Sequence, residues 1–173
     1  ISIIGFAILI DLIVGDPKNR FHPTAWIGTL IAKFTPILKH QNSLFEKIGG
    51  VFIIIFTSSI VILLLSSIDI VISLITVDYA SLIISVIVGA LLLKTTIAIR
   101  GMEKHAISVL ESLEDNNLDM ARNYLSMIVK RKTTNLDKNH VFSGVLESIS
   151  ENTVDGITGP MFYYAIFGLF GAF

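Results

Sequence analysis

The sequence predicts an all-α protein, a polytopic membrane helical bundle in one domain (residues 1–173) with a helical insertion on its cytoplasmic side. Three observations predict this class. The 173 residues are 53% hydrophobic and 16% charged, whereas soluble domains carry about 25% charged residues. Long runs of the chain carry no charge at all. Between them lies a polar stretch, residues 101–150, with the residue spacing of amphipathic helices.

The composition also excludes several classes of protein. The sequence contains no cysteine, so disulfide scaffolds, iron–sulfur centres and thiolate zinc sites are excluded. The formal net charge is −1, so no basic excess indicates a nucleic-acid partner. So apolar a chain has ample surface to bury, which argues against disorder.

Four apolar runs are predicted to cross the membrane, at residues 1–14, 48–68, 80–99 and 156–173. The two central runs are long enough, at 1.5 Å per residue, to cross a hydrocarbon core of about 30 Å. Helix is predicted despite many β-branched residues, because a strand in lipid would leave its backbone groups unpaired. A signal peptide is the alternative for the first run, but that run lacks a basic n-region and contains Asp11.

The distribution of basic residues predicts the orientation of these spans. Residues 16–47 contain five Lys or Arg and residues 94–155 contain the other eight, whereas the link 69–78 contains none. By the positive-inside rule the two basic segments are cytoplasmic, and the link and the N-terminus lie outside. Lys94 and Arg100, near one end of the third run, are expected to extend toward the interface.

Apolar residues of the insertion recur at spacings of three and four, as helices with one buried stripe require. The stripes occupy residues 107–113 and 118–128, and a third begins after Asp137. They predict three helices separated by two polar breaks. Asp119 is expected at the start of the second helix, where the helix dipole favours a carboxylate.

The first candidate site is the turn that follows the first apolar run. It contains Asp16-Pro17 and His22-Pro23. The prolines restrict the backbone, so a rigid loop would present Asp16 and His22 to a metal ion or a phosphate ester. The alternative is an interfacial turn with a capping Asp and a hydrogen-bonded His.

The second candidate site lies just before the last apolar run. Glu147, Glu151 and Asp155 are spaced four residues apart, on one face of a helix, with Asn152 among them. Like charges at this spacing repel, and Mg²⁺, which prefers carboxylate oxygens and bound phosphate, would relieve the repulsion. A solvated acidic face is the alternative. Glycine and proline residues follow directly and predict a break in the helix.

Three further features carry charge. The basic run Lys130–Lys132 either binds phosphate or anionic lipid, or anchors the chain as a positive-inside segment. Asp11 is an ionisable residue inside a predicted span, and therefore a functional candidate unless it reaches water at the helix end. His105 and His140 have no companion ligands at metal spacing and are predicted to be surface residues.

Two ordered motifs carry a resemblance to a known family. The first is Asp11-Leu12-Ile13-Val14-Gly15-Asp16-Pro17, with His22-Pro23 and Ile27-Gly28 after it. The second runs from Glu147 to Gly156 and on to Pro160-Met161-Phe162-Tyr163. Together they resemble the CobD/CbiB family of adenosylcobinamide-phosphate synthases, whose second block reads E-T-x-x-E-N-x-V-D-G-x-x-A-P-x-F-Y. The resemblance covers essentially the whole chain, but only the N-terminal half of a family member.

The resemblance implies a multi-pass membrane enzyme that joins the propionate carboxyl of adenosylcobyric acid to the amine of aminopropanol or of its phosphate. It implies Mg²⁺ and ATP as cofactors, and a corrinoid, the amine and membrane lipid as partners. The implied site residues are Glu147, Glu151 and Asp155 for Mg²⁺, Asn152 beside them, Asp16 and His22 for completing the site or transferring a proton, and Arg122, Lys130, Arg131 and Thr133 for binding phosphate or substrate.

Two positions depart from the family pattern. Lys132 stands where an acid is usual, and Ser143 stands where an Arg is common. Two other functions stay open beside the enzyme. One is a non-catalytic membrane sensor of the AmpE type, which shares the broad architecture. The other is a transporter, which is disfavoured because the central spans offer only Ser, Thr and Gly at the bilayer midplane. The chain alone is expected to be inactive.

Overall fold

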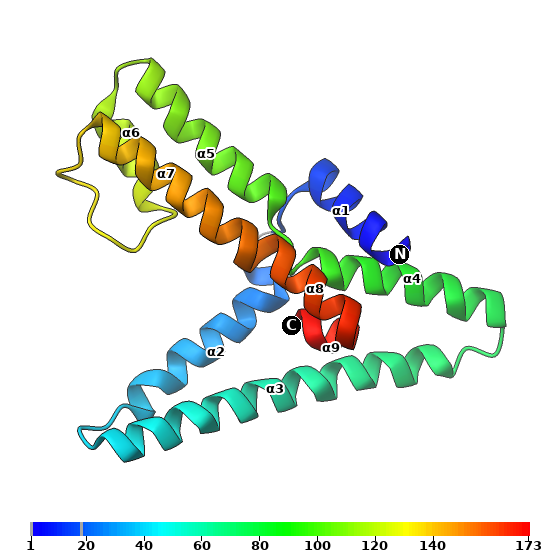
Figure 1. Ribbon diagram of the computed structural model, residues 1–173. Helices are drawn as coiled ribbons and strands as arrows, with labels where there is room; N and C mark the ends of the chain where they lie inside the picture. Colours follow the sequence, from blue (N-terminus) through cyan, green and yellow to red (C-terminus); the bar gives the residue numbers. More distant parts are fainter. Residues whose placement is uncertain (1, 18) are drawn as a thin grey trace.

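A computed structural model describes residues 2–17 and 19–173 (Figure 1). Over these residues the chain is predominantly helical and contains no strand, which confirms the all-α prediction. The elements are α1 (Ser2–Val14), η1 (Asn19–Phe21), α2 (Pro23–Leu38), α3 (Ser43–Ser73), α4 (Asp78–Lys94), α5 (Ile99–Glu114), α6 (Leu118–Ser126), α7 (Lys138–Thr153), η2 (Val154–Thr158), α8 (Gly159–Phe167) and α9 (Leu169–Ala172). The element η1 is a 3-10 turn and η2 is a π-helical turn.

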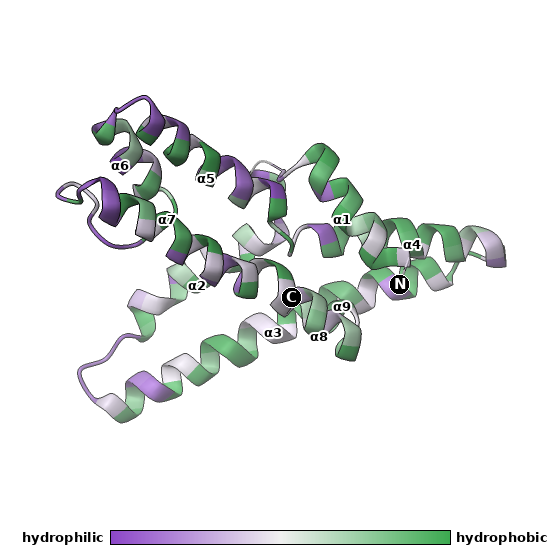
Figure 2. Cartoon of the chain, turned by 45° about the horizontal axis from the view of Figure 1, so that its top comes forward, coloured by the Kyte–Doolittle hydropathy of each residue, from purple (hydrophilic) through white to green (hydrophobic). Residues whose placement is uncertain are grey.

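Two helical segments are long and apolar enough to cross a membrane, as a membrane bundle requires. The first is Ser43–Ser73, which is α3. The second is Asp78–Glu114, which contains α4 and α5 on either side of a short bend. Only 17% of the most apolar stretch of the first segment is buried, and 28% of that of the second. Both therefore turn most of their apolar side chains outward, and α3 and α4 are hydrophobic over most of their length (Figure 2).

The ends of the predicted spans differ from the observed helices. Helix α1 has 13 residues, about 20 Å of helix at 1.5 Å per residue, which is shorter than the hydrocarbon core. The third span was predicted to reach residue 99, whereas α4 ends at Lys94. The hydroxyls of Thr95 and Thr96 donate to carbonyls three residues back, at 2.8 and 2.7 Å. Such bonds compete with the helical ladder and end it early.

The fourth predicted span, residues 156–173, is wrong as a continuous helix. The π turn η2 precedes α8, and Gly168 ends α8 with a φ of 64°. That backbone conformation is open to glycine and unfavourable for other residues. Helix α9 then packs back against α8. The segment is a short helical hairpin near the middle of the molecule (Figure 1).

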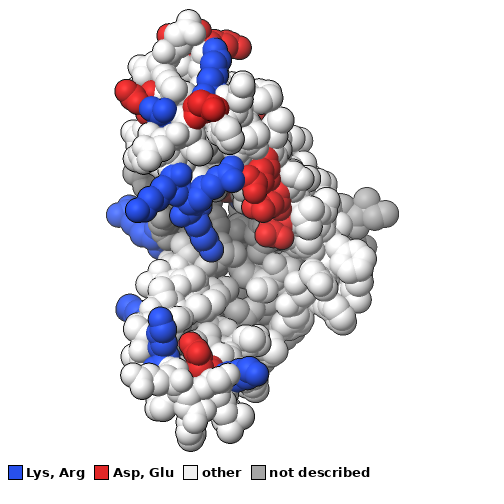
Figure 3. All heavy atoms as spheres, turned by 60° about the vertical axis from the view of Figure 1, so that its left-hand side comes forward, with Lys and Arg blue, Asp and Glu red and all other residues white. Residues whose placement is uncertain are grey.

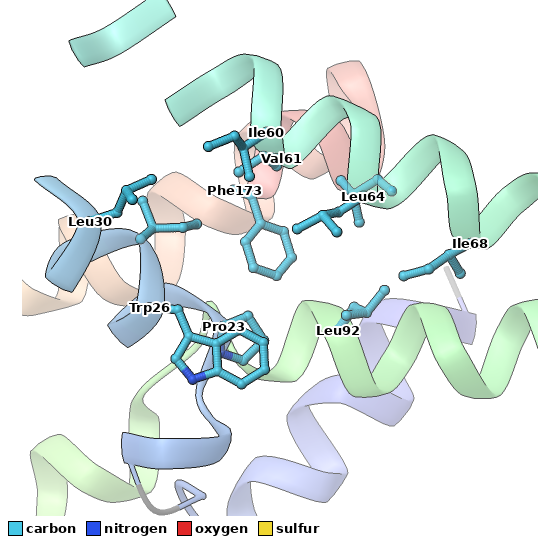
Figure 4. Close-up of a pocket in the computed structure, with 11 residues that line it drawn as sticks. Pro23, Trp26, Leu30, Ile60, Val61, Leu64, Ile68, Leu92 and Phe173 are labelled. Carbon is cyan, nitrogen blue, oxygen red and sulfur yellow. The ribbon is translucent and has the colours of Figure 1, made fainter. Parts of the chain in front are cut away.

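Helix α2 lies in the basic segment 16–47, for which the sequence analysis predicted no helix. Pro23 stands in its first turn, where a missing N–H costs nothing. The helix runs back along α3, and Phe34 meets Phe56 edge-on, with ring centroids 5.3 Å apart. Between α2, α3 and α4 lies an apolar groove of about 380 Å³, and Figure 4 shows Trp26 and Phe173 facing into it.

The insertion, α5 to α7, confirms the three predicted helices. Its apolar stripes meet in one buried core, formed by Ala106, Val109, Leu113, Ala121, Leu125, Val141 and Val145. Asn117 caps α6 by accepting a hydrogen bond from the Met120 N–H at 3.1 Å, so Asp119 lies in the first turn instead of at the predicted start. Asp137 caps α7 through the N–H of His140, at 2.8 Å.

The insertion is tied to the membrane helices where two irregular segments cross. The bend between α4 and α5 ends at Ala98, whose N–H donates to the carbonyl of Gly156 in the π turn, at 3.1 Å. The break that was predicted after Asp155 is wrong: the chain continues from α7 through the π turn into α8, and Thr153, Val154 and Gly159 all keep a right-handed helical backbone. This crossing places the candidate site between the two parts of the molecule.

Candidate functional site

Asp11 and Lys94 are buried at the end of α1 and form an ion cluster with Asp16, whose side chain is 32% exposed; we call these three residues the buried ion cluster. The Lys94 Nζ lies 3.4 Å from Asp11 Oδ1 and 3.0 Å from Asp16 Oδ1. Asp11 Oδ2 accepts a hydrogen bond from the backbone N–H of Arg100, at 3.0 Å. The predicted extension of Lys94 to the interface is wrong, since Lys94 is only 4% exposed. A buried ammonium needs such carboxylate partners, because removal from water is otherwise too costly.

The turn after α1 is built to hold Asp16 in this position. Gly15 has a φ of 74°, and its N–H donates to the carbonyl of Asp11 at 2.8 Å. The Arg100 guanidinium donates to the carbonyls of Leu12 and Ile13 at the C-terminus of α1, where the helix dipole favours a cation. A Cβ at Gly101 would overlap Asp16 Oδ2. The glycine therefore makes room for the carboxylate.

His22 lies beside this cluster, at the start of α2. The hydroxyl of Thr24 lies 2.7 Å from His22 Nδ1. Burial holds the pKa of His22 below its usual value; the negative charge of Asp16 opposes that shift, and the positive charge of Lys94 adds to it. His22 does not line either of the two cavities described next, so its predicted place in the site is only at the margin.

The acidic residues of α7 and η2 face Lys130 and Arg131 of the basic run across one cavity, which we call the charged cleft. Its volume is about 430 Å³, and its polar and charged lining consists of Lys130, Arg131, Glu147, Ser148, Glu151, Asn152 and Asp155. Arg131 and Glu147 form an ion pair across it, at 2.7 Å. Figure 3 shows basic and acidic side chains meeting on one hollowed face of the molecule. The structure thus brings the two predicted groups together.

The three carboxylates do not form a metal site by themselves. Within residues 2–17 and 19–173, no group of three or more His, Asp or Glu side chains could hold a metal ion. Glu147 is engaged by Arg131 instead of turning toward Glu151 and Asp155. The three carboxylates are therefore not positioned together around one Mg²⁺ ion, as the sequence suggested they would be.

A second cavity, the inner cavity, lies next to the charged cleft. It has a volume of about 220 Å³ and is lined by Asp16, Ala98, Gly101, Met102, His105, Ile128, Ser148, Ile149, Asn152 and Gly156. Three of these residues, Ile128, Ser148 and Asn152, also line the charged cleft. The two candidate sites of the sequence analysis are therefore neighbours, joined through Asn152.

His105 and His140 differ in their positions. His105 was predicted to lie on the surface, but it is half-buried and lines the inner cavity, with Nδ1 2.7 Å from the Gly101 carbonyl. Nothing in the sequence indicated this position, because Asp16, which lines the same cavity, comes from a distant part of the chain. His140 is exposed, as predicted, and contacts Asp137.

Arg122 and Thr133 lie outside the charged cleft and line a separate pocket of about 370 Å³ together with Asp119 and Thr134, so their role in binding phosphate stays a prediction. Arg122 donates to the carbonyl of Leu136 at 2.7 Å and pairs with Asp119 at 2.9 Å. Thr133 is buried in the same loop. These contacts hold the loop between α6 and α7 against α6. Of the four predicted phosphate-binding residues, only Lys130 and Arg131 line the charged cleft.

Comparison with known proteins identifies one family. The family described as CobD/Cbib protein matches residues 4–173. The probable cobalamin biosynthesis protein CobD of Thermoplasma acidophilum is 34% identical over 175 residues, which cover 100% of this chain and 54% of that protein. The cobalamin biosynthesis protein CobD of Leptospira interrogans is 39% identical over 165 residues, which cover 95% of this chain and 50% of that protein.

The chain spans about half the length of the curated relatives that it matches. No solved structure matches it. The match of the family over nearly all residues, with both motifs in place around one pair of cavities, is specific. The chain therefore belongs to the CobD/CbiB family.

Proposed function

We propose that this chain supplies part of the active site of an ATP-dependent amide-forming synthase of cobalamin biosynthesis. The enzyme would join the propionate carboxyl of adenosylcobyric acid to the amine of aminopropanol or its phosphate. Family membership and the names of the relatives support the pathway. The observation that carries the chemistry is the charged cleft, in which cationic and acidic walls face each other beside a helix crossing.

Amide formation from a carboxylate requires that an oxygen be made a leaving group. Transfer of the γ-phosphoryl group of ATP to the carboxylate gives an acyl phosphate and ADP. Attack by the amine then gives the amide and releases phosphate and a proton. Such a reaction needs a site that binds phosphate oxygens and keeps water out. Lys130 and Arg131 would bind those oxygens, since ammonium and guanidinium groups form charge-assisted hydrogen bonds to phosphate.

The acidic wall fits a Mg²⁺ ion that arrives with phosphate. In the described part of the chain Glu151 and Asp155 have no ion-pair partner, and Mg²⁺ in nucleotide sites is usually held by one or two carboxylates plus phosphate oxygens. When bound, the ion would neutralise charge on the phosphates. Glu147 would act differently, by orienting Arg131 through their ion pair. Asn152 would join this wall to the inner cavity.

Complementation tests the proposal. A strain that lacks the synthase is supplied with cobyric acid and given the full-length protein or its variants. We expect the wild type to restore cobalamin synthesis, and Glu151→Gln and Asp155→Asn each to lower amide formation by at least about tenfold. Glu111→Gln is the matched control, since Glu111 is an exposed glutamate of the insertion outside both cavities.

Two results would count against the proposal. Failure of the full-length wild type to restore cobalamin would reject the synthase and favour a non-catalytic membrane protein. Full activity of both Glu151→Gln and Asp155→Asn would reject the acidic wall as the place where the phosphates react.

We also propose that the protein is multi-pass, with the insertion in the cytoplasm, where ATP is available. The excess of basic residues in the insertion and in residues 16–47 supports this orientation. Residues 1–173 contain no cysteine, so a cysteine introduced into this chain is the only thiol that it contributes to labelling. Asn116→Cys should react with an impermeant maleimide only after cells are opened, and Ile75→Cys should react in intact cells. The reverse pattern would invert the topology.

A further inference from the structure

The inner cavity is lined by side chains whose hydrogen-bond donors are already used. Asn152 Nδ2 donates to the Ser148 carbonyl at 2.8 Å and to Ser148 Oγ at 3.1 Å. The Ser148 hydroxyl donates to the Ile128 carbonyl at 3.3 Å. His105 Nδ1 lies 2.7 Å from the Gly101 carbonyl, which can only accept, so Nδ1 carries the proton. For a neutral imidazole, what remains on His105 and Asn152 is a pair of acceptors, Nε2 and Oδ1.

Asp16 adds a third acceptor, and its orientation is fixed. Lys94 holds Oδ1 at 3.0 Å. The other oxygen, Oδ2, lies against the Cα of Gly101, where a side chain would overlap it. Among the described residues, Oδ2 has no hydrogen-bond partner. Asp11 also pairs with Lys94, at 3.4 Å, so the ion that positions Asp16 is itself held by a second carboxylate.

Three acceptors, one of them a carboxylate, match the chemistry of a primary ammonium group. Such a group carries a positive charge and three N–H donors, and it has no acceptor. The cavity volume of about 220 Å³ is below the range of about 300–1,000 Å³ typical of drug-sized ligands, so the ligand is small. A metal ion fits less well, because Asp16 and His105 are the cavity's only His, Asp or Glu side chains in the described part of the chain.

We propose that the inner cavity binds the ammonium group of a small primary amine, with Asp16 as the anchor and Lys94 as the residue that positions it. This inference rests on the proposed function, in which such an amine is the nucleophile. The shared lining of the two cavities places the amine next to the wall that would bind phosphate. The amine would thus enter beside the group that it attacks.

Calorimetry on the full-length protein in detergent tests the inference. The ligand is 1-aminopropan-2-ol, and its neutral counterpart is propane-1,2-diol, which has a hydroxyl in place of the ammonium. We expect the amine to bind, and Asp16→Asn to weaken its binding by at least about tenfold, as the loss of a charged hydrogen-bond partner does. Binding of the diol should be undetectable to both proteins. In the amide-forming assay the KM for the amine should rise in the same proportion, and the KM for ATP should stay unchanged.

A second variant avoids removing the charge of the buried ion cluster. In Gly101→Ala the new methyl group would displace Asp16 Oδ2, so affinity for the amine should fall although alanine is the better helix former. Gly50→Ala is the matched control, because a Cβ at Gly50 meets nothing within 4 Å. Thermal unfolding of each variant separates a loss of the fold from a loss of the site.

The outcomes separate this inference from the proposed function. If the wild type forms the amide and both Asp16→Asn and Gly101→Ala keep the wild-type affinity for the amine, the inference is wrong and the synthase stands. If the wild type forms no amide, the synthase is wrong, and the calorimetric comparison of wild type with Asp16→Asn still decides whether the cavity binds an amine. Equal competition by potassium chloride would show a general site for monovalent cations and overturn the inference.

Discussion

The long apolar helices and the insertion bury their hydrophobic residues in opposite ways. Helix α3 buries only four of its 31 residues, Gly49, Thr57, Leu65 and Ile72. In the insertion, Val109, Leu125 and Val141 are completely buried against one another. The insertion is thus stabilised by its own core, whereas α3 leaves its apolar surface for lipid or other helices.

The candidate site lies between these two regions and draws on both. The buried ion cluster lies on the membrane side, where α1 meets α4, and the charged cleft lies on α7 and the loop before it. Substitutions should therefore have unequal effects according to the region in which they fall.

The largest effect is expected for the charge at the centre of the buried ion cluster. Lys94→Met leaves Asp11 buried opposite Asp16 with no cation between them, and should cost about 3–5 kcal/mol of stability. Lys104→Met, at an exposed position of α5, should stay within about 0.5 kcal/mol. Unfolding of the detergent-solubilised protein measures both. The interpretation of the ion cluster fails if the two variants are equally stable, and adding Asp11→Asn to Lys94→Met should recover part of the loss.

A pair of identical substitutions compares the two regions directly. Leu125→Ala in the insertion should cost about 2–5 kcal/mol, because it opens a cavity in a closed core. Leu63→Ala on α3 removes a side chain that is 67% exposed and should cost less than about 1 kcal/mol. The same unfolding assay applies. Equal losses would show that the outward face of α3 is packed as tightly as the insertion.

A smaller effect should depend on pH and be confined to the insertion. Hydrogen bonds from the backbone N–H and the side chain of His140 hold the pKa of Asp137 below its usual value of 3.8. Because the folded pKa is the lower one, the cap stabilises the protein above pH 3.8, and the contribution is lost as the pH falls from 3.8 through the folded pKa. Asp137→Ala should melt earlier at neutral pH and lose this part of the acid dependence. Asp115→Ala, an exposed control, should keep it.

The smallest effect on stability is expected for the ion pair of the charged cleft. Arg131 and Glu147 have 48% and 54% of their side chains exposed, so solvent screens the pair. Glu147→Gln should cost less than about 1 kcal/mol, and the difference from wild type should shrink in high salt. A thermal-unfolding series at low and high salt checks this. A large loss that is insensitive to salt would indicate that the pair is buried by a further segment.

The spacing of apolar residues predicted the helices of the insertion, whose buried faces recur within a few residues of sequence. The stripe that contains Leu118 and Leu125 indicated its helix correctly, since a helix that folds onto its neighbours shows its buried face at spacings of three and four. Helix α2 was missed because two prolines and Lys33 interrupt its apolar positions. The partners of the charged residues could not be predicted for another reason: Lys94 contacts Asp16, which lies 78 residues away in sequence. Partners at that distance become visible only in the folded chain.

The bond from the Ala98 N–H to the Gly156 carbonyl has a consequence for how the site tolerates change. Both of its atoms belong to the main chain, so ordinary substitutions leave the crossing intact, and only a proline at position 98 would remove the donor. Substitutions can thus change the side chains that line the two cavities, while the main-chain hydrogen bond that sets the distance between the two segments stays the same.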